Sequence, residues 1–331
     1  MMYLTLAIVL IILLMGAYLY IKRTKHGYVD FNTGMLIKFM PDLGAMPPVK
    51  LRHSLEAYVS KNKHKVNVPV SRVEEVEIPT RHGQIRGRLY QNGTRSADRM
   101  IIFFHGGGWC IGSIDTHDEQ VRRMAVATGL PILSVNYSLS PEAKFPVAFE
   151  ECIDVITWAR NHQPELGTMA SSFVTMGDSA GANLAISTAK HFNNENKKII
   201  NTVIAIYPVT DMRAGQYPSR KLFESGFYLT QRAMDNFKEC YLSDSSQAND
   251  PRVSVIIDDD WKDFPKTFVL TTSLDPLRDE GIAFVQKLRS QGCDVQHHHV
   301  EGAIHGFFGV KAFGPKGLQA IEATATYITS N

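Results

Sequence analysis

The sequence predicts one large α/β domain, built on a mostly parallel β-sheet covered by helices. Its 331 residues are 44% hydrophobic and 21% charged, which is typical of a globular chain and unlike disordered or fibrous proteins. Short β-rich apolar runs alternate with helical patterns, and that alternation favours a parallel sheet with helices on its faces. A chain of this length buries roughly three-quarters of its unfolded surface, enough for a sizeable core.

Charge and cysteine content argue against several classes of protein. Thirty-five basic residues stand against 33 acidic ones, so no excess of positive charge would draw the chain to nucleic acid. Cys110, Cys152, Cys240 and Cys293 are scattered, without C-x-x-C or zinc-like spacing. We interpret them as free thiols, with two disulfides as the alternative.

The N-terminal 21 residues contain no ionisable side chain apart from tyrosines. A helix of this length rises about 30 Å, the thickness of the hydrocarbon core of a bilayer. Because a basic start and a small-residue cleavage site are both missing, we expect a retained single-pass membrane anchor rather than a cleaved signal peptide. The basic residues Lys22, Arg23 and Lys25 follow the run and place the large domain on the cytoplasmic side by the positive-inside rule.

The elements are expected in alternating order. Strands are expected at 73–78, 85–90, 100–105, 132–136, 173–176, 202–207, 267–272 and 294–300. Helices are expected at 115–128, 147–161, 180–192, 279–290 and 317–329. Long segments outside this rhythm are usually functional, so we expect those near 27–70 and 211–251 to form a cap. The chain then divides into an anchor (1–21), an N-terminal cap segment (22–72), a first core part (73–210), a cap insertion (211–252) and a second core part (253–331).

The sharpest motif is Gly177-Asp178-Ser179-Ala180-Gly181, placed after an apolar strand and before an Ala-rich helix. A serine on a tight strand-to-helix turn needs small flanking residues, because its backbone is strained and its hydroxyl must stand clear of neighbours. The start of the helix also presents N–H groups to developing negative charge. We therefore expect Ser179 to be a nucleophile.

A glycine run, His105-Gly106-Gly107-Gly108-Trp109, follows the strand expected at 100–105. Backbone N–H groups that no side chain obstructs are what a tetrahedral intermediate requires. The N–H groups of Gly107, Gly108 and Ala180 are our candidates for an oxyanion hole, with Gly106 as a further candidate. For His105 we favour a packing or loop-holding role over catalysis.

Two further residues complete an acyl-transfer set, Asp275 and His305, each following a strand. A serine needs a histidine to take its proton, and the histidine needs a carboxylate to fix its tautomer. The chain order Ser, Asp, His is the order that α/β-hydrolases use. Asp279 and Glu280 are alternatives to Asp275, but their position at a helix start favours capping.

Other residues receive structural interpretations. His297-His298-His299 alternate across a strand with no carboxylate pair at ligand spacing, so no metal site is expected. Cys110 is interpreted as a small buried hydrophobe. The aromatic residues of the insertion are expected to be both cap core and lining of the acyl pocket. The expected pocket residues are Trp109, Phe223, Phe227 and Tyr228.

Together these motifs resemble the hormone-sensitive-lipase-like branch of the α/β-hydrolases, which includes bacterial carboxylesterases and arylacetamide deacetylases. The likeness covers roughly residues 100–310 and also includes Asp115-Thr116-His117, Asn136 to Glu142, Phe145-Pro146, Asp275 to Glu280 and His305 to Phe308. It implies an eight-stranded core, a cap from the N-terminal helices and the insertion, and ester hydrolysis without a cofactor. Ala182, Ser138 and Ser140 depart from the family pattern without removing a catalytic group.

These observations predict a membrane-anchored serine carboxylesterase acting on a lipophilic ester through an acyl-enzyme. Short to medium acyl chains are what the resemblance implies. Two alternatives stay open: an amidase or deacetylase of acetylated small molecules, and a ligand-binding protein on a hydrolase scaffold. The sequence leaves the alcohol portion of the substrate and the formation of a homodimer undetermined.

Overall fold

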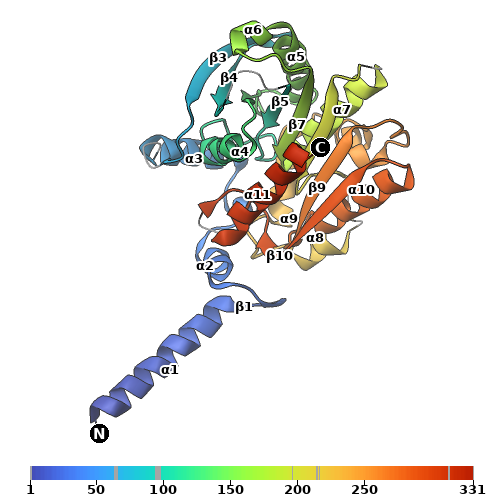
Figure 1. Ribbon diagram of the computed structural model, residues 1–331. Coiled ribbons are helices and arrows are strands. Elements are labelled where there is room, and N and C mark those ends of the chain that lie inside the picture. Colours follow the sequence, from blue (N-terminus) through green and yellow to red (C-terminus); the bar gives the residue numbers. More distant parts are fainter. Residues whose placement is uncertain are drawn as a thin grey trace.

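The computed structural model describes residues 2–62, 66–93, 98–195, 197–213, 215, 217–311 and 314–330, with side chains from Leu10 onward. Its centre is an eight-stranded sheet with the strand order β10-β9-β8-β7-β5-β6-β4-β3 (Figure 1). The strands are β3 (Arg72–Thr80), β4 (Gly83–Gln91), β5 (Arg99–Phe104), β6 (Ile132–Asn136), β7 (Ser172–Asp178), β8 (Ile200–Ile206), β9 (Lys266–Leu274) and β10 (Val295–Ile304).

The sheet is mostly parallel, as predicted. The strands from β6 across to β10 pair in parallel, while β4 pairs antiparallel with both β3 and β6. Because the carboxyl ends of parallel strands meet at one edge, the segments after β5, β7, β9 and β10 come together there. That edge is where the glycine run, Ser179, Asp275 and His305 follow their strands.

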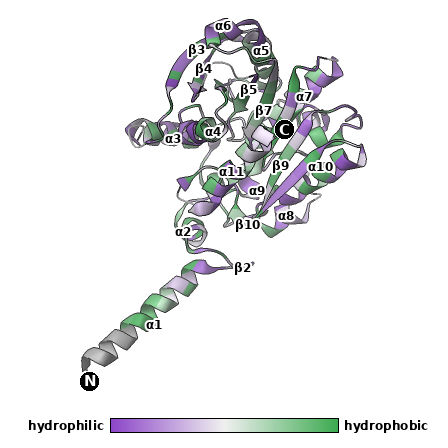
Figure 2. Cartoon of the chain, viewed as in Figure 1, coloured by the Kyte–Doolittle hydropathy of each residue, from purple (hydrophilic) through white to green (hydrophobic). Residues whose placement is uncertain are grey.

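Helices cover both faces of this sheet. The five core helices are α4 (Asp118–Thr128), α5 (Val147–Asn161), α7 (Ala180–Asn194), α10 (Arg278–Ser290) and α11 (Pro315–Ser330). Along β5, Met100, Ile102 and Phe104 belong to the core cluster under α5, α7 and α10, whereas Ile101 and Phe103 belong to the cluster under α4 and α11. This alternation follows from the two-residue side-chain period of a strand. The alternation confirms the predicted α/β fold class. Hydrophilic residues lie on the outside of the molecule, for example along the edge strand β10 (Figure 2).

The two segments outside the alternation contain short helices that pack together. The N-terminal segment holds α2 (Phe31–Phe39), the 3₁₀ turn η1 (Leu43–Ala45) and α3 (Pro48–Asn62), and the insertion holds α8 (Pro218–Leu222), α9 (Gln231–Tyr241) and the 3₁₀ turn η3 (Ser245–Asn249). A third apolar cluster joins Leu43, Leu51 and Leu55 of the first segment to Ala233 and Phe237 of α9. Segments almost 200 residues apart thus share one small core.

The predicted membrane anchor requires a correction. Residues Met2–Lys22 form helix α1, which extends away from the sheet in Figure 1 and meets α2 through a stacked Tyr18–Phe31 pair, with ring centroids 5.7 Å apart. Across the part of the chain that the structure describes, no helix combines the length and apolar character needed to cross a membrane. The prediction of a single-pass anchor with a cytoplasmic catalytic domain is therefore wrong.

Candidate active site

Ser179 occupies a strained turn between β7 and α7. Its φ of 55° and ψ of −118° lie where side-chain-bearing residues are uncommon. No larger residue fits at either flanking glycine. A Cβ on Gly177 would lie 2.3 Å from the backbone of Gly181, and one on Gly181 would lie 2.0 Å from the Phe104 carbonyl oxygen. The turn can therefore form only with glycine at both positions, and it lifts the serine side chain clear of the sheet.

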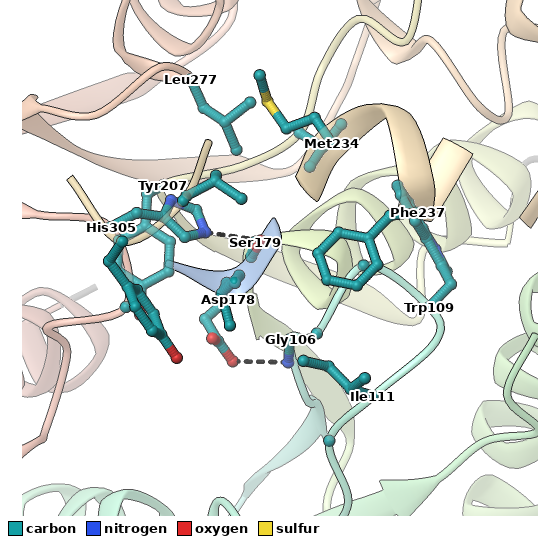
Figure 3. Close-up of a pocket in the computed structure, with 18 of the residues that line it drawn as sticks. Gly106, Trp109, Ile111, Asp178, Ser179, Tyr207, Met234, Phe237, Leu277 and His305 are labelled. Atoms are coloured by element: carbon teal, nitrogen blue, oxygen red, sulfur yellow. Dashed lines mark hydrogen bonds between the residues drawn. The ribbon is translucent and has the colours of Figure 1, made fainter. Parts of the chain in front are cut away.

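The three residues expected to form a triad are in hydrogen-bonding contact. The Ser179 hydroxyl lies 2.8 Å from His305 Nε2 (Figure 3). On the other side of the ring, His305 Nδ1 lies 2.8 Å from Asp275 Oδ2. With Nδ1–H donating to the carboxylate, Nε2 is free to accept the serine proton. The loops after β7, β9 and β10 thus bring together side chains that are up to 126 residues apart.

Neighbouring groups fix the carboxylate and the imidazole in place. Asp275 is fully buried, and its second oxygen accepts the Leu277 N–H at 2.8 Å. The ring of Tyr207 packs against the His305 ring, with the two ring centroids 4.5 Å apart. Tyr207 has a φ of 35° and was not identified from the sequence. The only sequence signal for it was its position directly after a buried strand.

The glycine run forms a tight loop beside Ser179. Gly107 and Gly108 adopt φ values of 121° and 57°, a region that favours glycine. The Gly106 N–H donates to Asp178 Oδ1 at 3.0 Å and is therefore already occupied. Among the described residues, the N–H groups of Gly107, Gly108 and Ala180 have no such acceptor. These three stay the candidates for an oxyanion hole, and Gly106 serves instead to tie the loop to the serine turn.

Asp178 and two histidines form an electrostatic cluster under this loop. Burial alone would raise the pKa of the Asp178 carboxyl, but His117, 3.4 Å away, and the Gly106 N–H together lower that pKa below its usual value. His105 is fully buried, stacks 4.3 Å from the Tyr137 ring and donates from Nδ1 to the Gly106 carbonyl at 2.8 Å. Burial, assisted by His117, lowers the pKa of His105 to about 3. His105 is thus a neutral loop-holding residue.

A cavity of about 610 Å³ opens onto Ser179 and His305. Its walls are largely apolar and come from the core, the N-terminal segment and the insertion. Figure 3 shows Met234 and Phe237 of the insertion facing Ser179 and His305. The apolar lining residues include Leu43, Leu55, Val59, Ile111, Val209, Met234, Phe237 and Leu277. Leu43, Leu55 and Val59 were missed from the sequence, because nothing in the local pattern of the N-terminal segment shows that it lies against α9.

The expected pocket residues divide into two groups. Trp109 and Tyr228 line the cavity, and Trp109 is held by a stacked contact with Tyr241 at 4.2 Å between ring centroids. Phe223 and Phe227 do not line it, and this part of the expectation is corrected. They form an edge-to-face pair in the core cluster under α4 and α11, packed against the His26 ring. Their short helix and turn direct these rings toward the N-terminal segment.

The alternative acids have other partners. The Asp279 carboxylate accepts the Ser219 N–H at 2.8 Å. Glu280 is fully buried, accepts the Thr210 N–H at 2.8 Å and pairs with Arg220 at 2.6 Å, so it connects α10 to the base of the insertion. Burial raises the pKa of Glu280 even though Arg220 opposes the shift. Neither carboxylate reaches His305, whose hydrogen bond goes to Asp275.

Metal-ligating side chains do not gather in the parts of the chain that the structure covers. No group of three or more His, Cys, Asp or Glu residues suited to a metal ion occurs there. His297 and His299 instead share the Thr271 hydroxyl, each at 2.8 Å. The four cysteines are free thiols in this structure.

Comparison with known proteins places this geometry in a family. A family model described as the alpha/beta hydrolase fold matches residues 101–309. The chain is 33% identical to Lipase 2 of a Moraxella species, over 74% of this chain and 63% of the lipase. It is 30% identical to an arylesterase of Saccharolobus solfataricus, over 73% of this chain and 78% of that enzyme. For the Moraxella lipase, the match therefore spans less than two thirds of the relative's own length.

Solved structures agree with this relationship. An esterase of Pyrobaculum calidifontis superposes with a TM-score of 0.81 at 33% identity, covering 87% of this chain and 94% of the esterase. A thermostable carboxylesterase cloned from a metagenomic library superposes with a TM-score of 0.82 at 31% identity, covering 86% of this chain and 98% of the carboxylesterase. The chain belongs to the α/β-hydrolase fold family, in its hormone-sensitive-lipase-like esterase branch.

Proposed function

We propose that this protein is a carboxylic ester hydrolase that works through a serine acyl-enzyme. The observation that carries the proposal is the continuous chain of 2.8 Å contacts from Asp275 through His305 to Ser179, at the wall of a cavity. The names of the relatives, which are lipases, arylesterases and carboxylesterases, support the same reaction. This is also the enzyme class expected from the sequence.

The proposed reaction has two steps. Ser179 attacks the ester carbonyl while His305 Nε2 takes its proton, and the imidazolium then protonates the departing alcohol. Water, deprotonated by the same nitrogen, hydrolyses the acyl-enzyme. Asp275 keeps Nδ1 protonated through its 2.8 Å contact and stabilises the positive charge on His305 in both steps.

We assign stabilisation of the negative charge on the tetrahedral oxygen to the N–H groups of Gly107, Gly108 and Ala180. The first two belong to the loop that Asp178 ties down, and the third begins α7, where the helix dipole also favours negative charge. Such donors act strongly because they are held in place before the reaction begins. A loss of one typically costs about 3 kcal/mol in the transition state.

For the substrate, we propose a lipophilic ester with a short to medium acyl chain. A volume of about 610 Å³ and a mostly apolar lining suit such a molecule. We further propose that 22–72 and 211–252 together form the cap that encloses it, since both contribute lining residues. The core parts, 73–210 and 253–331, carry the catalytic residues.

The test is hydrolysis of a p-nitrophenyl ester series from acetate to palmitate, with the wild-type protein and its Ser179→Ala variant. Removal of the nucleophile lowers kcat by several orders of magnitude. Ser187→Ala is the matched control, because Ser187 is buried on the same helix and its hydroxyl donates only to the Leu184 carbonyl. Equal rates for Ser179→Ala and wild type would refute the serine mechanism. Parallel anilide substrates distinguish an amidase, and stable binding of an ester without turnover would favour a binding protein.

A further inference from the structure

We propose that Cys110 and Cys240 form a dithiol site that closes to a disulfide when the protein meets a small-molecule disulfide, linking the glycine loop to cap helix α9. Cys110 lies two residues after Gly108, and its N–H donates to the Gly107 carbonyl at 3.0 Å. Cys240 lies near the end of α9. The two side chains therefore belong to the two elements that enclose Ser179.

The thiols are brought together by the packing of α9 onto the loop. Cys110 Sγ lies 3.8 Å from the carbonyl oxygen of Phe237. Cys240 follows Phe237 by three residues, so both lie on the same face of the helix. The Cys240 thiol is a hydrogen-bonding neighbour of Cys110, and both side chains belong to the same small apolar cluster.

The other two cysteines provide an internal contrast. Cys152 is buried on α5, in the large core cluster beneath α5, α7 and α10. Cys293 packs against that same cluster, and its thiol donates to the Trp261 carbonyl at 3.2 Å. Neither lies in the cluster that contains the Cys110–Cys240 pair.

The difference in burial sets the order of the chemistry. Burial, together with the adjacent Cys240 thiol, raises the pKa of Cys110 well above its ordinary value, whereas Cys240 is only partly buried. The Cys240 thiolate therefore attacks the small disulfide first and releases one thiol. The Cys110 sulfur then attacks the Cys240 sulfur of the mixed disulfide and releases the second thiol. The two cysteine protons end on the two released thiols, so the reagent is reduced as the protein is oxidised.

Closing this bond acts on the proposed active site through Phe237 and Gly108. A Cβ built on Gly108 would lie 2.3 Å from the Phe237 ring, which shows how tightly α9 already covers the loop. A disulfide brings its two sulfurs to about 2.05 Å and its two Cβ atoms to about 3.8 Å, closer than two thiols in contact, so closing the bond draws loop and helix together by on the order of 1 Å. Displacements of that size at reacting groups lower rates by about a hundredfold. Oxidation is therefore expected to lower ester turnover by tenfold or more.

The first readout is the covalent bond itself, which does not depend on the proposed esterase activity. The full chain is incubated with oxidised glutathione, blocked with iodoacetamide and digested with trypsin. The expected product is a cross-linked pair of the peptides 100–122 and 239–252, which contain Cys110 and Cys240. Recovery of both peptides in fully alkylated form, or pairing of either with Cys152 or Cys293, would overturn the proposal.

The second readout is turnover of p-nitrophenyl butyrate before oxidation, after it, and after reduction with dithiothreitol. Wild type and the matched control Cys293→Ser are expected to lose activity on oxidation and regain it on reduction. Cys240→Ser is expected to keep its activity throughout. Formation of the cross-link without a change in turnover would refute the effect on the loop, while absence of turnover in every reduced sample would count against the proposed function alone.

Discussion

Replacement of Gly108 by alanine tests whether the glycine loop supplies the oxyanion donors. Gly108 has a φ of 57°, and a Cβ at this position would lie 2.3 Å from Cγ and 2.4 Å from Cδ2 of the Phe237 ring. Carbon atoms in contact are normally about 3.5 Å apart or more, so the loop or the ring must retreat by more than 1 Å. Phe237 lies on α9 and its side chain is buried, so its ring has little room to move. The strain therefore falls on the loop.

Two contributions to the effect are separable. An L-residue in the left-handed region costs about 1–2 kcal/mol in stability, wherever it lies. Displacement of one oxyanion donor costs about 3 kcal/mol in the transition state, which corresponds to a 10²- to 10³-fold loss of kcat. Gly292→Ala is the matched control, because Gly292 has a φ of 78° and its Cβ would meet nothing within 4 Å. We expect both variants to lose stability, Gly108→Ala by more because of its contact with Phe237, and only Gly108→Ala to lose kcat.

The assay is kcat and kcat/KM on p-nitrophenyl butyrate, with thermal unfolding measured on the same samples. A double variant that combines Gly108→Ala with Phe237→Ala removes the ring that the new methyl group meets. We expect it to recover at least tenfold of the lost kcat relative to Gly108→Ala. If Gly108→Ala keeps wild-type kcat, or if removal of the ring recovers nothing, the assignment of this loop to the oxyanion hole is refuted.

Three further changes probe other parts of the site. Asp275→Asn keeps the shape of the side chain beside His305 but favours the wrong tautomer of the His305 imidazole, so we expect kcat to fall by about 10⁴-fold while KM changes little. If kcat stays within tenfold of the wild-type value, Asp275 is not the acid of the triad. The pKa of His105 is lowered to about 3 in the folded protein. Between about pH 6.5 and pH 3, His105 is therefore protonated in the unfolded chain but neutral in the folded state. Its contribution to the free energy of unfolding is fully present above pH 6.5 and is lost toward pH 3, by about 1.4 kcal/mol per pH unit. In denaturant unfolding from pH 6 to pH 4, the free energy of unfolding of His105→Gln should therefore depend less steeply on pH than that of the wild type. An unchanged pH dependence would contradict this assignment. Leu55→Ala removes part of the apolar wall of the cavity and is expected to lower kcat/KM for the longer p-nitrophenyl esters by about five- to tenfold. The ester chain-length series measures this. An equal loss on the acetate would show that Leu55 does not contact the acyl chain.

Local patterns were sufficient to predict the core elements and to indicate the candidate catalytic residues that the structure brings together. The eight strands and five core helices occur close to where their periodicity placed them, because each has a buried face whose spacing is visible in sequence. Ser179, Asp275 and His305 follow strands that are parallel neighbours or near neighbours in the sheet, so strand order alone gathers them at one edge. The glycines of the serine turn are required by backbone contacts, and glycine is a visible signal.

Tertiary packing decided what the local patterns did not contain. The contact of the N-terminal segment with α9, the exclusion of Phe223 and Phe227 from the cavity and the use of the Gly106 N–H by Asp178 each depend on which distant surface a segment meets. An apolar side chain has no directional preference among apolar neighbours, so its sequence predicts burial but not the partner. The same limit applies to the 21-residue apolar start, where hydropathy predicted a span and the described structure has none. Sequence thus determined which residues are the candidates for catalysis and which segments are buried, while the arrangement of the chain in space determined what encloses them.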